Sequence, residues 1–174
     1  IQLAEGTGFT TTTPFQGVLP VIPDVGIPEP ARLSRYTTDE AATYKFDIAD
    51  TYWTGKALGK LSTLSAIADA TGNKTAQTQA LDKTKALLED YFNASGTPKG
   101  LFYYNKPWGT LIGYPASFGS DEALNDHHFH YGYWIRTMAE IALRDPQWAS
   151  KAQWGGMVDM LVADIATMRR GAAD

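Results

Sequence analysis

The hydrophobic positions of the chain follow a helical period from about Thr38 onward. In the first helical stretch they recur at spacings of three and four residues, at Ala57, Leu58, Leu61, Leu64 and Ala68. Gly72 is placed to end this helix and Asn73 to cap the next one, which we expect over residues 74–94. Because the connection is so short, the pattern predicts two antiparallel neighbouring helices.

Residues 95–119 interrupt this rhythm, with Gly or Pro every few residues. Within them, "LFYYN" and "GTLIGY" have the composition of two short strands and predict a hairpin. A long non-helical connection inside a helical domain usually serves function.

A third helix is expected from about Leu124 to Leu143. Asp145 then has the place of an N-cap and Pro146 that of a first helical residue, which predicts a fourth helix reaching about Met168. The pattern therefore indicates two helical hairpins joined by an aromatic loop over residues 38–174.

Residues 1–37 have a different character. Five of the nine prolines fall between Pro14 and Pro30, a density that excludes a regular helix or a central strand. We expect residues 1–37 to form an extended linking segment docked on another surface.

Composition narrows the function classes. The chain is 44% hydrophobic and 20% charged, with a net charge of −4 and no run of basic residues, so nucleic acid is not an expected partner. Cysteine is absent, which excludes disulfides and thiolate metal sites. No apolar run approaches the ~20 residues that span a bilayer, so we expect no membrane partner. The chain starts at Ile1 without a visible signal peptide, as expected of a processed or excised piece.

Aromatic residues are frequent: five Trp, nine Tyr and seven Phe make up 12% of the chain. Several stand in polar or Gly-rich context within residues 101–119. Aromatic faces in loops suit sugar-binding clefts, because the C–H face of a pyranose is apolar and packs flat on a ring. The alternative is that these rings only fill a core.

The stretch "LNDHHFHYGYW" contains all three histidines of the chain. On a helix Asp126 and His130 lie one turn apart on the same face. Three interpretations remain open at this point: a metal site, an acid/base pair, or an N-cap followed by buried histidines. Helical zinc motifs place two histidines at i and i+4, and no His pair here has that spacing, which disfavours the metal.

Acid/base chemistry needs a carboxyl that keeps its proton. An aromatic wall that restricts water favours the protonated form, whereas the positive end of the helix dipole favours the carboxylate. Asp126 would therefore need burial or a second nearby carboxylate, with His130 orienting it or binding substrate.

The segment "FGSDEALNDHHFHYGYW" (118–134) resembles a signature of glycoside hydrolase family 81, the inverting endo-β-1,3-glucanases. Four further segments resemble the family in the same order: "FTTTTPFQGVLPVIP" (9–23), "DTYWTGKALGKLSTLSAIADATG" (50–72), "LFYYNKPWGTLIGYPASFG" (101–119) and "LRDPQWA" (143–149).

The resemblance implies a mainly α fold, the first helical hairpins of an incomplete (α/α)6 toroid. It implies that Asp126 is the general acid, with His130 and Asp121 supporting or contacting the site. It also implies a secreted enzyme that needs no cofactor or metal and has β-1,3-glucan and the remainder of a parent chain as partners. Candidate sugar platforms are Trp53, Trp108, Tyr114, Tyr131 and Tyr133.

One part of the family pattern has no counterpart in the sequence. An inverting glycosidase needs a second carboxylate to activate water, and the family's Glu-rich base motif does not occur in these 174 residues. We therefore expect a fragment that holds the acid but not the base and is inactive alone. The alternatives are a non-catalytic β-glucan-binding helical module and a metal-dependent hydrolase that uses the histidines.

Overall fold

The computed structural model describes residues 2–3, 9–10, 26–46, 50–93 and 100–166, and the chain divides into two compact units, residues 1–30 and 31–174. In the first unit, strands β1 (Gln2–Leu3) and β2 (Phe9–Thr10) pair antiparallel. Most of the linking segment expected over residues 1–37 lies outside the described residues.

Helix α1 (Pro30–Thr43) begins at the boundary between the units, and all but its first residue belong to the second unit. The helical pattern was expected to start only near Thr38, so that boundary is wrong. Pro30 is the first residue of the helix, where its missing N–H costs nothing and its fixed φ suits the helix. The last proline of the Pro-rich stretch is therefore the first residue of α1.

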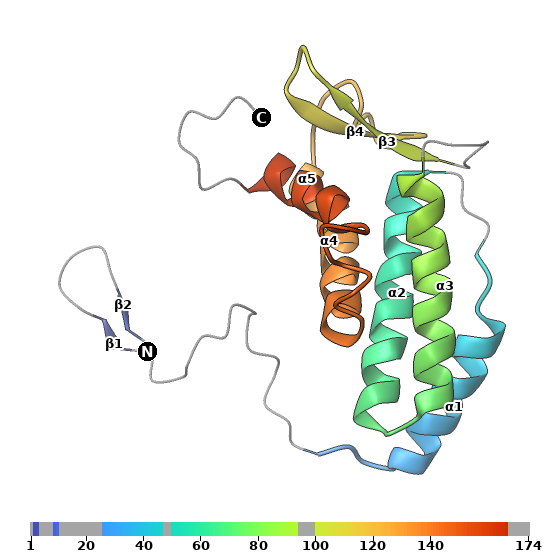
Figure 1. Ribbon diagram of the computed structural model, residues 1–174. Helices are drawn as coiled ribbons and strands as arrows, with labels where there is room; N and C mark the ends of the chain where they lie inside the picture. The colour runs from blue at the N-terminus through green and yellow to red at the C-terminus, as the bar shows by residue number, and fades with distance from the viewer. Residues whose placement is uncertain (1, 4–8, 11–25, 47–49, 94–99, 167–174) are drawn as a thin grey trace. The chain divides into compact units, whose positions relative to one another are not determined.

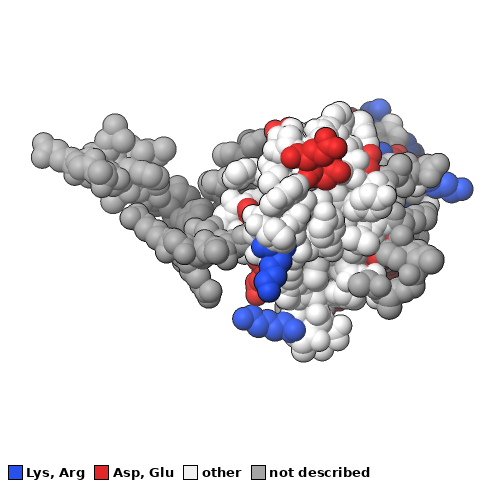
Figure 2. Space-filling view, turned by 90° about the horizontal axis from the view of Figure 1, so that it is seen from above, with Lys and Arg blue, Asp and Glu red and all other residues white. Residues whose placement is uncertain are grey.

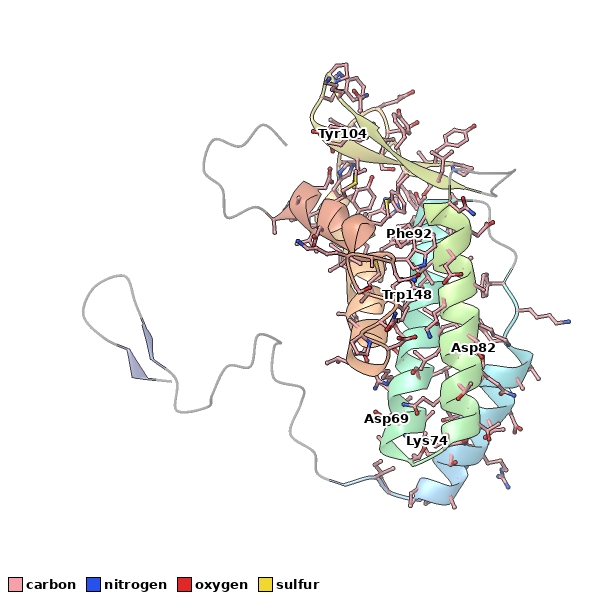
Figure 3. The ribbon with its side chains drawn as sticks, in the orientation of Figure 1. Asp69, Lys74, Asp82, Phe92, Tyr104 and Trp148 are labelled. Carbon is pink, nitrogen blue, oxygen red and sulfur yellow. The ribbon has the colours of Figure 1, made fainter. Side chains whose placement is uncertain are left out.

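Helices α2 (Thr51–Ala70) and α3 (Lys74–Phe92) pack side by side, as the spacing predicts. Gly72 has a positive φ of 69°, and the Asn73 side chain accepts a hydrogen bond from the Ala76 N–H. Asp69 and Lys74 form an ion pair across this turn (Figure 3). Both predicted capping residues are confirmed.

Helix α1 packs on this pair through small side chains. Ala41, Ala68 and Ala76 form a fully buried cluster that allows the three helices to approach closely. The Lys83 ammonium donates to the carbonyls of Ala41 and Ala42 near the end of α1, where helix carbonyls lack partners.

Strands β3 (Leu101–Asn105) and β4 (Thr110–Tyr114) form the predicted antiparallel hairpin, with Leu101 opposite Tyr114 and Asn105 opposite Thr110. The hairpin lies across the end of the bundle at which α2 begins and α3 ends (Figure 1).

Helix α4 (His127–Arg144) packs against α2, and α5 (Gly155–Ile165) packs against α4. The fourth helix was expected to open at Asp145, which is wrong. Asp145 instead ends α4, and turns lead through residues 146–154 to Gly155. The turns place Trp148 in the main core, where its indole N–H donates to Glu89 (Figure 3).

The described fold is mainly α, as predicted, with one large core between α2, α3, α4, α5 and the hairpin. Its buried members include Leu58, Leu88, Leu111, Trp134, Met138, Ile141 and Leu161. Within the described residues, none of the helices has the length and apolar character required to span a membrane.

Candidate active site

Helix α4 is anchored by side chains that bind the backbone of its neighbours. The Tyr131 hydroxyl donates to the Leu111 carbonyl at 2.9 Å and accepts from the Gly113 N–H at 3.1 Å. The Trp134 indole N–H donates to the Thr51 carbonyl at 3.0 Å. These bonds hold the first half of α4 against strand β4 and the start of α2.

Two glycines permit this close approach. A Cβ on Gly113 would lie 2.6 Å from the Thr51 hydroxyl, and one on Gly55 would lie 2.9 Å from the Trp134 indole nitrogen. Because real Cβ atoms do not approach other atoms so closely, β4 and α4 can lie on α2 only where these side chains are absent.

Asp126 precedes α4 in a left-handed conformation, with φ 58° and ψ 18°. It occupies the N-cap position, and its carbonyl accepts from the His130 N–H at 2.7 Å, but its side chain makes no capping hydrogen bond. The carboxylate is exposed and accepts from the Asn125 amide at 3.2 Å. The Asp126 side chain thus does not serve the cap that one interpretation assigned to it.

His127, the first residue of α4, is buried between two acceptors. Its Nδ1 lies 2.8 Å from the Asp164 carboxylate and its Nε2 lies 3.3 Å from the Ser120 carbonyl. Burial opposes protonation, but the bonds to Asp164 and Ser120 prevail and raise the pKa of His127 above its ordinary value. The ring therefore keeps its second proton to a higher pH than an ordinary histidine does.

His130 lies one turn further along and behaves in the opposite way. It is only 2% exposed, and its Nε2 has no hydrogen-bond partner. Burial lowers the pKa of His130, and the positive charge of His127 adds to the effect. His130 is therefore a neutral imidazole with an unused polar atom.

Asp126 and His130 line the same pocket, of about 200 Å³. Its other walls are Tyr52, Ser117, Phe118, Ser120, Asn125 and Phe129. The Tyr52 ring is central, since it contacts Phe118 edge-on at 4.9 Å and His130 edge-on at 5.8 Å between ring centroids. Phe118 and Phe129 are 67% and 59% exposed, so two aromatic faces border the carboxylate.

The Tyr52 wall is positioned by the N-terminus of α2. Asp50 caps this helix by accepting from the Trp53 N–H at 2.9 Å, and the same oxygen accepts from the Ser117 hydroxyl at 3.2 Å. Thr51 donates through its N–H to the Pro115 carbonyl at 3.1 Å. These bonds join the start of α2 to the loop that carries Ser117 and Phe118.

The predicted site residues separate into three groups. Asp126 and His130 lie together in the pocket, whereas Trp53, Trp108 and Tyr114 are exposed but do not line it. Tyr133 contacts the rings of Tyr52 and Phe129 behind the pocket wall, and Asp121 is half-buried outside it.

Tyr131 is not a sugar platform. It is 1% exposed, and both hydrogen-bonding capacities of its hydroxyl are used by β4. Burial raises the pKa of this hydroxyl well above its ordinary value. Its side chain belongs to the core, because the α4 face that meets the hairpin includes residue 131.

Sequence reasoning missed Tyr52, Phe118 and Phe129 as pocket residues, although each lies inside a quoted motif. Tyr52 directly precedes Trp53, and Phe129 stands between two histidines. The prediction named neighbouring aromatic residues instead, because periodicity does not show which side of a loop or of a helix start faces a cleft. The high local density of aromatic residues indicates a binding site, but it does not distinguish adjacent rings.

The described part of the chain contains no cluster of metal ligands that would support a metal site. No group of three or more His, Asp or Glu side chains there is arranged to hold an ion. His127 uses both ring nitrogens for other bonds, which leaves neither free to coordinate.

Comparison with known proteins extends these observations. The sequence profile of the glycosyl hydrolase family 81 C-terminal domain matches residues 32–173. A glucan endo-1,3-beta-D-glucosidase from Acetivibrio thermocellus is 51% identical over 98% of this chain, and one from Thermobifida fusca is 43% identical over 94% of it. The chain spans 22% of the length of each of these relatives.

A solved structure shows the same fold. A glycoside hydrolase family 81 protein from Clostridium thermocellum superposes with a TM-score of 0.78 at 50% identity, over 90% of this chain and 22% of that one. Together with the profile match over most of the sequence, this similarity shows that the chain belongs to glycosyl hydrolase family 81.

Proposed function

We propose that this chain carries the general acid of an inverting endo-1,3-β-glucanase that cuts internal bonds of laminarin or cell-wall glucan. The observation that carries the proposal is the position of Asp126. Its carboxylate is exposed, makes no capping bond and lines a pocket bordered by aromatic rings and a neutral imidazole. The names of the relatives support β-1,3-glucan as the substrate.

In this proposal the aromatic rings bind the sugar. The apolar faces of glucose units pack on Phe118 and Phe129, which border the carboxylate. The bound glucan shields Asp126 from water, and a carboxyl in such surroundings retains its proton more readily. The buried imidazole of His130 contacts the Tyr52 ring and so helps to shape the pocket beside the carboxyl.

Asp126 then donates its proton to the glycosidic oxygen as the bond to the anomeric carbon breaks. Inversion requires a second carboxylate, roughly 6.5–9.5 Å from the first, to activate water on the opposite face of the sugar. Among the described residues Asp126 is the one carboxylate that lines the pocket. In this proposal the general base is supplied by a longer protein, in which the rest of an (α/α)6 toroid would complete the cleft.

The surface beside the hairpin suits an uncharged ligand. Viewed from that end, most of the described surface carries neither acidic nor basic side chains (Figure 2). A neutral polysaccharide is recognised by stacking and hydroxyl hydrogen bonds rather than by charge. A polysaccharide substrate also implies that the protein acts outside the cell.

Asp126→Asn tests the proposal in a full-length enzyme that contains this chain and is as long as its relatives. The amide keeps the size and polarity of the side chain but cannot donate an acidic proton. We expect laminarin hydrolysis, measured as released reducing sugar, to fall by at least about 10³-fold, while titration calorimetry shows laminari-oligosaccharide binding unchanged.

Two results separate the proposal from its alternatives. Near-normal turnover of the Asn variant would remove Asp126 from the role of acid. Binding without hydrolysis by the unmutated full-length protein would instead show a glucan-binding module.

A further inference from the structure

The best-connected polar side chain near the pocket is one that the proposed reaction does not use. Asp164, on α5, accepts from His127 at 2.8 Å, from the Thr110 hydroxyl at 2.7 Å and from the Leu111 N–H at 2.6 Å. One carboxylate thereby joins α5, strand β4 and the start of α4.

His127 extends this connection to the pocket wall. Its second ring nitrogen meets the carbonyl of Ser120, which lines the pocket, and its backbone directly follows Asp126. The side chains of His127 and Asp164 are 9% and 3% exposed, so water does not substitute for these bonds.

Only the imidazolium form can make both bonds. A carbonyl and a carboxylate are acceptors, so both ring nitrogens must donate. When the ring loses a proton, the remaining one stays on Nδ1, because Asp164 is ionised and attracts it. Nε2 then turns a lone pair toward the Ser120 carbonyl, and this hydrogen bond between the wall and α4 is lost.

The backbone of the pocket loop needs such support. Phe118, Leu124 and Asp126 all have positive φ, of 56°, 50° and 58°, although none is glycine. A left-handed conformation is unfavourable for residues other than glycine and persists only where the surroundings enforce it.

We propose that His127 is a positioning residue: as an imidazolium held between Asp164 and the Ser120 carbonyl, it maintains the left-handed turn at Asp126 and the adjoining pocket wall. Its relevance to catalysis rests on the proposed function, in which Asp126 is the reacting group. The pocket is then fully assembled only while His127 keeps its proton.

The groups around His127 define its titration. From α5 it meets Asp164, and from its own helix it interacts with His130 and contacts the Tyr131 ring at 4.5 Å. From the loop it meets the Ser120 carbonyl, and from β4 the Thr110 hydroxyl reaches it only through Asp164. Asp164 is thus the charged partner that decides when the ring loses its proton.

Nitrogen-15 NMR of the chain tests the ring state directly, because only three histidines need assignment. His128 is exposed and adjacent, so His128→Phe is the matched control variant. We expect both ring nitrogens of His127 to stay protonated above pH 6.5, the ordinary value for histidine. The amide signals of Ser120 and Asp126 should shift with the His127 ring, in His128→Phe as in the parent.

Asp164→Asn separates charge from hydrogen bonding. The amide oxygen still accepts from Thr110 and Leu111, and its NH2 donates to a neutral His127, whose Nε2–H continues to donate to Ser120. We expect this variant to keep its fold and to lose the pH-dependent shift of the Ser120 and Asp126 amides above pH 6. In the full-length enzyme, His127→Phe should lower kcat about tenfold or more with little change in KM, and His128→Phe should not.

Three results would overturn the proposal: a His127 ring that loses a proton at or below pH 6.5, amide signals of Ser120 and Asp126 that do not follow His127, or the same pH dependence in the Asn variant as in the parent. If the protein neither binds nor hydrolyses glucan, the proposed function is wrong, but the NMR test of the His127 ring still applies. The two failures are thus distinguishable.

Discussion

Asp126 and His130 are joined by the first hydrogen bond of helix α4, from the His130 N–H to the Asp126 carbonyl at 2.7 Å. This bond places a residue with left-handed backbone one turn before a buried imidazole. The Asp126 carboxylate is exposed while the His130 ring is enclosed, yet both border the same pocket. A carboxyl group and an imidazole thus border one opening.

The buried state of His130 predicts a pH dependence of stability. Burial lowers its pKa, so between its ordinary value of 6.5 and the lower folded value the unfolded chain binds more protons than the folded one. The free energy of unfolding should therefore fall as pH drops below 6.5. We expect His130→Phe to reduce this slope in urea unfolding between pH 5 and 7, with His128→Phe as control. An unchanged slope would show that folding does not shift the pKa of His130.

The exposed aromatic walls predict where sugar binds. Phe118→Ala and Phe129→Ala should each weaken laminari-oligosaccharide binding about two- to tenfold, since an aromatic stacking contact contributes about 0.5–1.5 kcal/mol. Trp108 is 56% exposed but lies outside the pocket, so Trp108→Ala is the matched control. Titration calorimetry distinguishes the positions, and an equal loss in the control would show that sugar binds at the hairpin instead.

The buried hydroxyl of Tyr131 predicts a loss of stability without a loss of binding. Tyr131→Phe leaves the Gly113 N–H and the Leu111 carbonyl without this partner, which should lower the free energy of unfolding by about 1–3 kcal/mol. Tyr104 lies exposed on the hairpin (Figure 3), so Tyr104→Phe should change stability little. Weaker glucan binding in folded Tyr131→Phe would return Tyr131 to the sugar-binding surface.

The 174-residue chain by itself should bind glucan without hydrolysing it. Among its described residues one carboxylate lines the pocket, whereas inversion requires two. We expect the purified chain to bind laminari-oligosaccharides by calorimetry and to release no reducing sugar from laminarin. Hydrolysis by this chain would show that a residue within it acts as the base.

Much of the local structure could be predicted because it depends on neighbours in sequence. Gly72 and Asn73 end one helix and begin the next through their own backbone and side-chain chemistry, and the Gly/Pro-bounded strands form their hairpin. The early start of α1 was missed because proline density was given more weight than the tolerance of a helix for proline at its first position.

The remaining features depend on partners distant in sequence. Asp145 and Pro146 have the form of a helix start, but burying Trp148 against Glu89 and the core favours turns there. Local pattern leaves Tyr131 and Phe129 equivalent, two rings on one helix, and packing against β4 makes the first a core residue and leaves the second facing the pocket.

The candidate acid illustrates the same division. The motif that contains Asp126 can be recognised in one short stretch of sequence, and so can its position before a helix. The opening in front of it depends on Tyr52 and Phe118, brought from the start of α2 and from the loop after β4. Residue order specifies capping and periodicity, because these act over one or two helical turns. Chain folding alone decides which faces remain uncovered, because that depends on contacts between segments dozens of residues apart.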